Sequence, residues 1–298
     1  MNYLIISASL FVLAAIVSGN NLSAGVGSLI GSNVTGRRFA ILIATIGFTV
    51  GFLVGTERMS STVHTLLPYG SLLVFLVIWG SVAIFIIAQL ARVPISLTMA
   101  IVGIAVGVFV RRGDLSALSS VEKIALMWVI APPIAIGISY TVSAMLIRRK
   151  VTRIWRTASL MKSLIIALGF FSSFTLGENT LGFIGALGDG GFVSYFFVVL
   201  GIVFGSLFLS GGVVRTLGYD MYSISYSNAL SSMLSSSLLV EAATIFGIPL
   251  SNTQALTSGI IGAGLARRMR AVSLRPIVRI TLLWFASPLV GIALGLII

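Results

Sequence analysis

The chain of 298 residues contains no cysteine and one histidine, and only 9% of its residues are charged. Without cysteine it forms no disulfide, thiolate metal site or cysteine nucleophile, and the redox state of its compartment stays open. An intramembrane enzyme would need a nucleophile with a base, a metal cluster or paired acids, and the sequence offers neither an intramembrane histidine nor a pair of aspartates. We therefore expect a protein that is not an enzyme and that has no cofactor.

Apolar residues make up 57% of the chain, with 32 glycines and a mean hydropathy of +1.12. Apolar stretches of about 20 residues recur from end to end, which is the length of a membrane-spanning helix. We expect an all-α polytopic protein that crosses the lipid bilayer of the cell membrane many times. The first stretch lacks a basic leader and a cleavage site, so it is expected to stay as a span and not to be removed as a signal peptide. Spans are expected near residues 3–17, 39–55, 69–90, 124–147, 160–176, 192–209, 231–247 and 278–298.

The net charge of +12 does not indicate a nucleic-acid partner. The basic residues lie at the ends of apolar segments and not along a soluble face with interleaved aromatics, so membrane topology explains them better. The densest basic cluster lies between two halves of the chain and predicts a cytoplasmic linker at 148–157. Its members are Arg148, Arg149, Lys150, Arg153 and Arg156.

The sequence repeats itself at an offset of about 155 residues. PISLTMA at 94–100 is echoed by PLSNTQA at 249–255, and each copy is followed by an apolar glycine-rich stretch, a basic doublet and a tryptophan four residues before a proline. Asn20 has a counterpart in Asn179. This order predicts one duplicated unit, with a first transmembrane repeat at 1–147 and a second at 158–298.

The two halves are expected to insert in opposite orientations, because Arg37 and Arg38 correspond to the acidic Asp189. The segments 94–110 and 249–266 are short for a span and begin with polar residues, which indicates broken or re-entrant helical hairpins. Short, interrupted segments at matching places in two halves are typical of a transport site.

The repeated motif has the composition of an anion site. A proline followed by hydroxyl residues is typical of a helix start, where backbone N–H groups are unpaired and the helix dipole is positive. Two such starts aimed at one point would suit a tetrahedral oxyanion. Hydroxyl donors would come from Ser96, Thr98, Ser251 and Thr253. In the alternative interpretation these hydroxyls only cap or link membrane helices.

These motifs resemble those of the inorganic phosphate transporter (PiT) family, which includes a sulfate permease branch. That family carries G-A-N-D-V-A-N-A and P-V-S-T-T-H in each of two inverted halves. Residues 18–24 and 177–180 occupy the first motif here, and 94–99 and 249–254 the second. The resemblance covers nearly the whole chain. It implies a homodimeric secondary transporter of phosphate, whose substrate site would also include Asn20, Asn21, Asn179 and Thr180.

The chain departs from the family at charged positions. Asn21 and Thr180 replace aspartates, Met99 and Gln254 replace histidines, and Phe48 replaces a glutamate. The carboxylate ligands for a cation are missing, so the resemblance does not imply that transport by this chain is coupled to sodium. Asn21 and Asn179 still offer oxygens to a coupling ion.

Glu178 is the ionisable residue of most interest, because it precedes Asn179 in an apolar context. Carboxylates at membrane depth are costly and usually functional, so Glu178 is a candidate proton carrier, the alternative being a loop-exposed position. Glu241 is expected to pair with a basic residue, whereas Glu57, Arg58 and His64 are interpreted as charges of interfacial loops. The residues expected to line the pathway are Asn228, Asn252 and Gln254.

Together these features predict an ion-coupled secondary transporter of inorganic phosphate or a similar tetrahedral oxyanion, working by alternating access. Na⁺ or H⁺ would be the coupling ion of this symport. Two alternatives stay open, a sulfate permease of the same fold and an uncoupled anion channel. The ability to concentrate substrate separates a transporter from a channel.

Overall fold

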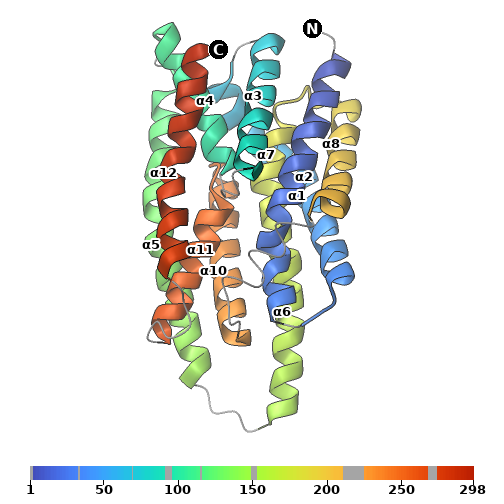
Figure 1. Cartoon of the computed structure of the whole chain (residues 1–298), viewed down its shortest axis with the longest axis vertical. Helices are drawn as coiled ribbons and strands as arrows, with labels where there is room; N and C mark the ends of the chain where they lie inside the picture. Colours follow the sequence, from blue (N-terminus) through green and yellow to red (C-terminus); the bar gives the residue numbers. More distant parts are fainter. Residues whose placement is uncertain are drawn as a thin grey trace.

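The computed structural model describes residues 3–32, 34–68, 70–90, 96–114, 116–148, 153–210, 225–267 and 274–298. All regular structure in these ranges is helical, and most helices run along the long axis of the molecule (Figure 1). Five helical segments in them are long and apolar enough to cross a membrane, which confirms the expected all-α polytopic protein. They are Leu4–Leu22, Arg37–Leu66, Leu118–Arg148, Ile154–Gly185 and Phe192–Leu209.

Five helices belong to the first half and the remaining elements to the second. The first half contains α1 (Tyr3–Gly31), α2 (Arg37–Leu66), α3 (Ser71–Leu90), α4 (Leu97–Arg112) and α5 (Leu118–Arg148). The second half contains α6 (Ile154–Leu176), the π-helical turn η1 (Gly177–Leu181), α7 (Gly182–Gly185), α8 (Phe192–Phe204), the π-helical turn η2 (Gly205–Leu209), α10 (Tyr226–Ile245), α11 (Asn252–Ala266) and α12 (Leu274–Ile297).

Several helices extend beyond the expected spans. Helix α1 runs to Gly31 and so includes the first asparagine motif, while α2 runs to Leu66. Glu57, Arg58 and His64 are therefore helical, and their interpretation as loop charges is wrong. Helix α6 begins at Ile154, inside the predicted linker 148–157, whose residues 149–152 lie outside the described ranges. The division into two repeats around that linker stays a prediction.

The two motif helices each pack on the last helix of the opposite half, α4 on α12 and α11 on α5. Glycines bring the first pair together, because a Cβ at Gly103 or Gly107 would meet a backbone carbonyl of α12, and one at Gly291 or Gly295 would meet a carbonyl of α4. Small residues at a spacing of four let membrane helices approach this closely. The glycine-rich stretch after each motif thus serves helix packing and holds the motif on the opposite half.

Helices at the start of each half also pack on helices of the opposite half, α1 on α8 and α2 on α6. In Figure 1, α5 descends to the lower end while α12 rises to the C-terminus at the top, and α1 descends while α6 rises. These directions are those that an inverted repeat requires, and the inverted repeat itself stays a prediction.

Candidate functional site

Both hydroxyl motifs begin a helix, as their sequence predicts. Ser96 is the N-cap of α4 and Ser251 the N-cap of α11, and both have extended backbone. The hydroxyls within each motif contact each other, with 3.2 Å between Ser96 Oγ and Thr98 Oγ1 and 3.0 Å between Ser251 Oγ and Thr253 Oγ1. Since one hydroxyl of each pair donates to the other, one hydroxyl hydrogen per motif remains for another acceptor.

Asn179 holds the loop that leads into α11. Its Nδ2 donates to the carbonyl oxygen of Ile248 at 3.0 Å and to Thr244 Oγ1 at 2.9 Å, and its Oδ1 accepts the N–H of Leu250 at 2.9 Å. The side chain is fully buried in η1, and π-helical turns of this kind are frequent at functional sites. In this conformation Asn179 positions the second motif, while its direct contact with substrate or ion stays a prediction.

Trp128 of α5 contacts both motifs. Its indole Nε1 donates to the carbonyl oxygen of Pro249 at 3.0 Å, and its ring packs against Met99 and Trp284. Its own carbonyl oxygen accepts Gln254 Nε2 at 2.9 Å. Within a helix that carbonyl would bond the N–H four residues later, but this position is proline and has no N–H. The W-x-x-x-P spacing therefore frees one carbonyl for the second motif, and it is the sequence signal by which this contact could have been found.

Two buried polar atoms at the second motif have no partner in the described part of the chain, Asn252 Nδ2 and Gln254 Oε1. Native proteins pair nearly all such atoms with protein, water or ligand. In the first motif the matching positions are Leu97 and Met99, which have no comparable polar group. The two helix starts are therefore chemically unequal, and the second offers both a donor and an acceptor to a ligand.

The remaining predicted site residues fall at different places. Thr180 is buried in η1 beside Asn179, and Asn20 and Asn21 lie half-buried in α1, which packs against η1 and α11. Asn228 is buried in the first turn of α10, whereas Thr244, which meets Asn179, lies near the end of α10. With a rise of 1.5 Å per residue the two are about 24 Å apart along the helix. A pathway lined by Asn228 would have to extend over this distance from the second motif. That Asn228 lines the pathway stays a prediction.

Glu178 is fully buried and forms an ion pair that sequence reasoning missed. Arg58 Nη1 lies 2.9 Å from Glu178 Oε1 and 3.2 Å from Glu241 Oε1. The pairing expected for Glu241 is confirmed, and the loop-exposed alternative for Glu178 is wrong. The contact requires α2 to touch η1 at the backbone, and Gly55 permits this because a Cβ there would collide with the main chain of Glu178.

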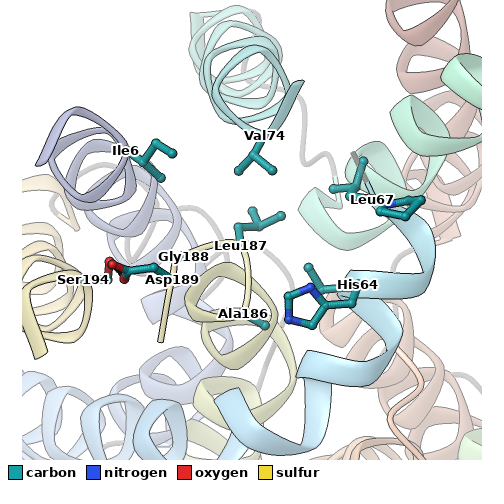
Figure 2. Close-up of a pocket in the computed structure, with 11 residues that line it drawn as sticks. Ile6, His64, Leu67, Val74, Ala186, Leu187, Gly188, Asp189 and Ser194 are labelled. Carbon is teal, nitrogen blue, oxygen red and sulfur yellow. Dashed lines mark hydrogen bonds between the residues drawn. The ribbon is translucent and has the colours of Figure 1, made fainter. Parts of the chain in front are cut away.

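A cavity of about 450 Å³ lies away from the motifs, at the end of the molecule where α1 begins and α2 ends (Figure 2). It is mostly apolar, with His64 and Asp189 among its lining residues, and a second hollow of about 340 Å³ shares both of them. Asp189 lies in the turn before α8, where the Ser194 hydroxyl and the Gly191 N–H donate to its carboxylate. These hydrogen bonds lower the pKa of Asp189 below its ordinary value.

Known proteins resemble this chain in sequence and in fold. The model of the phosphate transporter family matches residues 17–183 and again 155–295. A protein of Methanocaldococcus jannaschii named "Putative phosphate permease" is 26% identical over 97% of this chain and 94% of its own length. The sulfate permease CysP of Bacillus subtilis is 25% identical over 97% of this chain and 86% of its own length.

A solved structure titled "The sodium-dependent phosphate transporter" superposes with a TM-score of 0.85, at 17% identity, over 100% of this chain and 98% of its own length. At that identity the match establishes a shared fold. The proteins found by these comparisons are permeases and transporters by name, and none of those cited is named as an enzyme. The family match spans well over half of the sequence, and the chain therefore belongs to the phosphate transporter family.

Proposed function

We propose that this protein is a secondary transporter that moves inorganic phosphate, or a similar tetrahedral oxyanion, across the cell membrane by alternating access. The observation that carries the proposal is the position of Trp128, which bonds the second motif and packs against Met99 of the first. One tryptophan side chain thereby contacts residues of both motifs. Membership of the phosphate transporter family and the names of the relatives support the same substrate class.

The anion would be held by neutral donors. Helices α4 and α11 have 16 and 15 residues, long enough for each to place a partial positive charge and free N–H groups at its start. Ser96, Thr98 and Ser251 are nearly fully buried, so their hydroxyls act in a medium of low dielectric. A site built from hydroxyls and amides binds an anion without the cost of an unpaired buried cation when the substrate leaves. This suits a transporter, which has to release what it binds.

The packing suggests how the site would open to either side. Helix α4 is tightly joined to α12, and α11 to α5, so each pair would move as a unit. Because each pair contains one motif, a rocking of one pair against the other would change the separation of the two helix starts around a bound anion. The π-helical turns η1 and η2 interrupt regular helices where such motion would be absorbed. The homodimer that the family resemblance implies stays a prediction.

Sulfate is a second candidate substrate, for a specific chemical reason. Phosphate keeps a proton near neutral pH and can donate a hydrogen bond to a carboxylate, whereas sulfate only accepts. Asn21 and Thr180 stand where the family carries aspartates, so the site lacks the carboxylates that would repel sulfate. The sulfate permease relative aligns over 97% of this chain. The unpaired Oε1 of Gln254 is an acceptor that would instead favour protonated phosphate.

Purified protein in lipid vesicles tests the proposal. Uptake of labelled phosphate and labelled sulfate is compared under imposed proton or sodium gradients, and accumulation above the outside concentration excludes an uncoupled channel. Hydrogen bonds to charged groups contribute about 1.5–3 kcal/mol, so Ser96→Ala with Ser251→Ala should weaken anion affinity at least about tenfold. Wild-type affinity in that double variant would overturn the assignment of the site.

A further inference from the structure

Three charged side chains from three separate elements meet beside the second motif. Glu178 comes from η1, Arg58 from α2 and Glu241 from α10. One guanidinium nitrogen, Arg58 Nη1, serves one oxygen of each carboxylate, at 2.9 Å and 3.2 Å. The other oxygen of each carboxylate, Oε2, is buried and has no hydrogen-bond partner in the described ranges. We call Glu178 and Glu241 the carboxylate pair.

The charges of this cluster do not balance when both carboxylates are ionised. Two negative charges then share one positive charge, and two buried oxygens lack donors, which is costly in a low dielectric. Because an oxygen of Glu178 and an oxygen of Glu241 both contact the same nitrogen, Arg58 Nη1, the two carboxyl groups lie close together. One added proton makes the cluster neutral and supplies the missing donor between the two carboxyl groups, as in other carboxyl pairs that share a proton.

Other titratable groups on the neighbouring elements do not complete the cluster. On α2, Glu57 and His64 are exposed, and within the described residues neither is hydrogen-bonded to the carboxylate pair. On α6, Arg156 and Lys162 lie at the opposite end of the helix from η1. Arg58 thus carries the positive charge that faces the carboxylate pair in the described part of the chain.

We propose that Glu178 and Glu241 together hold the proton that couples transport, with Arg58 shared between them. This inference rests on the proposed function and adds Glu241 and Arg58 to the coupling machinery. The side chains of Arg58 and Glu241 are 40% and 21% exposed, whereas that of Glu178 is fully buried. A proton therefore reaches the pair through Glu241 and is retained by sharing it with Glu178.

The carboxylate pair is connected to the anion site by adjacent residues. Asn179 follows Glu178 in the chain and bonds Thr244, which lies one helical turn after Glu241 on α10. The same asparagine holds Leu250, next to the N-cap of α11. Protonation changes the repulsion between the two carboxylates and hence the fit of η1 against α10. That change passes through Asn179 to the start of α11, where the anion would bind.

A proton fits the pair better than a sodium ion. Both polar atoms of the Asn179 amide are already bonded to protein, so a cation at its Oδ1 would compete with the N–H of Leu250. A metal cation at the two Oε2 atoms would also lie close to the guanidinium of Arg58, and like charges at such a distance repel strongly in a low dielectric. A proton adds the donor that both oxygens lack and needs no further ligands.

Two measurements on the same vesicles separate coupling from substrate binding. Counterflow, the exchange of internal unlabelled anion for external labelled anion, needs no net proton movement, whereas accumulation driven by a pH gradient does. We expect Glu178→Gln and Glu241→Gln each to keep counterflow and to lose proton-driven accumulation, because one remaining carboxylate is neutralised by Arg58. Proton uptake on anion binding, read with a pH indicator in weakly buffered detergent solution, should fall from about one per anion to about zero.

Glu57→Gln is the matched control, since it removes an exposed carboxylate next to Arg58 and should behave like the wild type in both assays. If wild-type protein exchanges neither phosphate nor sulfate, the proposed function fails, and the inference with it. If wild type exchanges anion but Glu241→Gln keeps full proton-driven accumulation, or sodium alone drives accumulation without proton uptake, the carboxylate pair is overturned. Should both glutamine variants lose exchange, Glu241→Asp has to restore exchange and proton uptake, and its failure would also overturn the inference.

Discussion

Replacing Asn179 with alanine is the sharpest test of how the second motif is positioned. The amide makes three hydrogen bonds of 2.9–3.0 Å, to Thr244, Ile248 and Leu250. Thr244 keeps its own bond to Val240, so the loss falls on the partly buried carbonyl of Ile248 and the buried N–H of Leu250. Each buried group left unpaired costs about 1–3 kcal/mol. We expect Asn179→Ala to lower the free energy of unfolding by about 2–5 kcal/mol.

Two readouts distinguish a positioning role from simple loss of packing. The Tm in detergent reports stability, and the Kd for phosphate or sulfate reports the geometry of the helix start. The Tm should fall and the Kd should rise, because the position of the Ser251 hydroxyl depends on the loop that Asn179 holds. Ser173→Ala is the control, since among the described residues this buried hydroxyl bonds only the Gly169 carbonyl of its own helix, at 2.8 Å. Wild-type Tm and Kd in Asn179→Ala would refute the reasoning.

Three further changes test other parts of the structure. Gln254→Met removes the donor to the Trp128 carbonyl, so anion affinity should fall by about 0.5–1.5 kcal/mol, roughly two- to twelvefold, in a binding assay. Gly103→Ala should lower the Tm because its Cβ would meet the backbone of α12, whereas Gly137→Ala, with open space around it, should not; equal Tm values would contradict the packing argument. The pKa of Asp189 is lower in the folded state, so its stabilisation is present above the unfolded pKa and is lost as pH falls through the folded pKa. Asp189→Asn should therefore flatten the acid dependence of Tm, and an unchanged dependence would count against those hydrogen bonds.

Much of the fold could be predicted from the residues alone, because the period and length of apolar stretches are local properties. The helix starts at Ser96 and Ser251 follow from a proline and hydroxyls ahead of an apolar run. The limits of α2 did not follow, because Glu57, Arg58 and His64 resemble an interfacial loop in composition. They continue as helix, and Arg58 there forms an ion pair with Glu178, a partner that lies far away in the sequence.

The ion pair between distant residues had no local signal. Arg58 and Glu178 are 120 positions apart, and nothing near either residue indicates the other. The contact of Trp128 with Gln254 had a partial signal in the W-x-x-x-P spacing, because the proline leaves the Trp128 carbonyl without a helical partner. Only the tertiary structure shows that Gln254 is the residue that bonds this carbonyl.

The sequence by itself determined the membrane environment, the helical class and the duplicated motifs, since these depend on composition and on spacing along the chain. The tertiary structure alone decided the partners. Glycine contacts between helices join each motif to the opposite half, and a single arginine joins two carboxylates from separate helices. Side chains that meet across a helix bundle are selected by close packing and by the cost of unpaired buried charge, and both exist only once the helices are assembled.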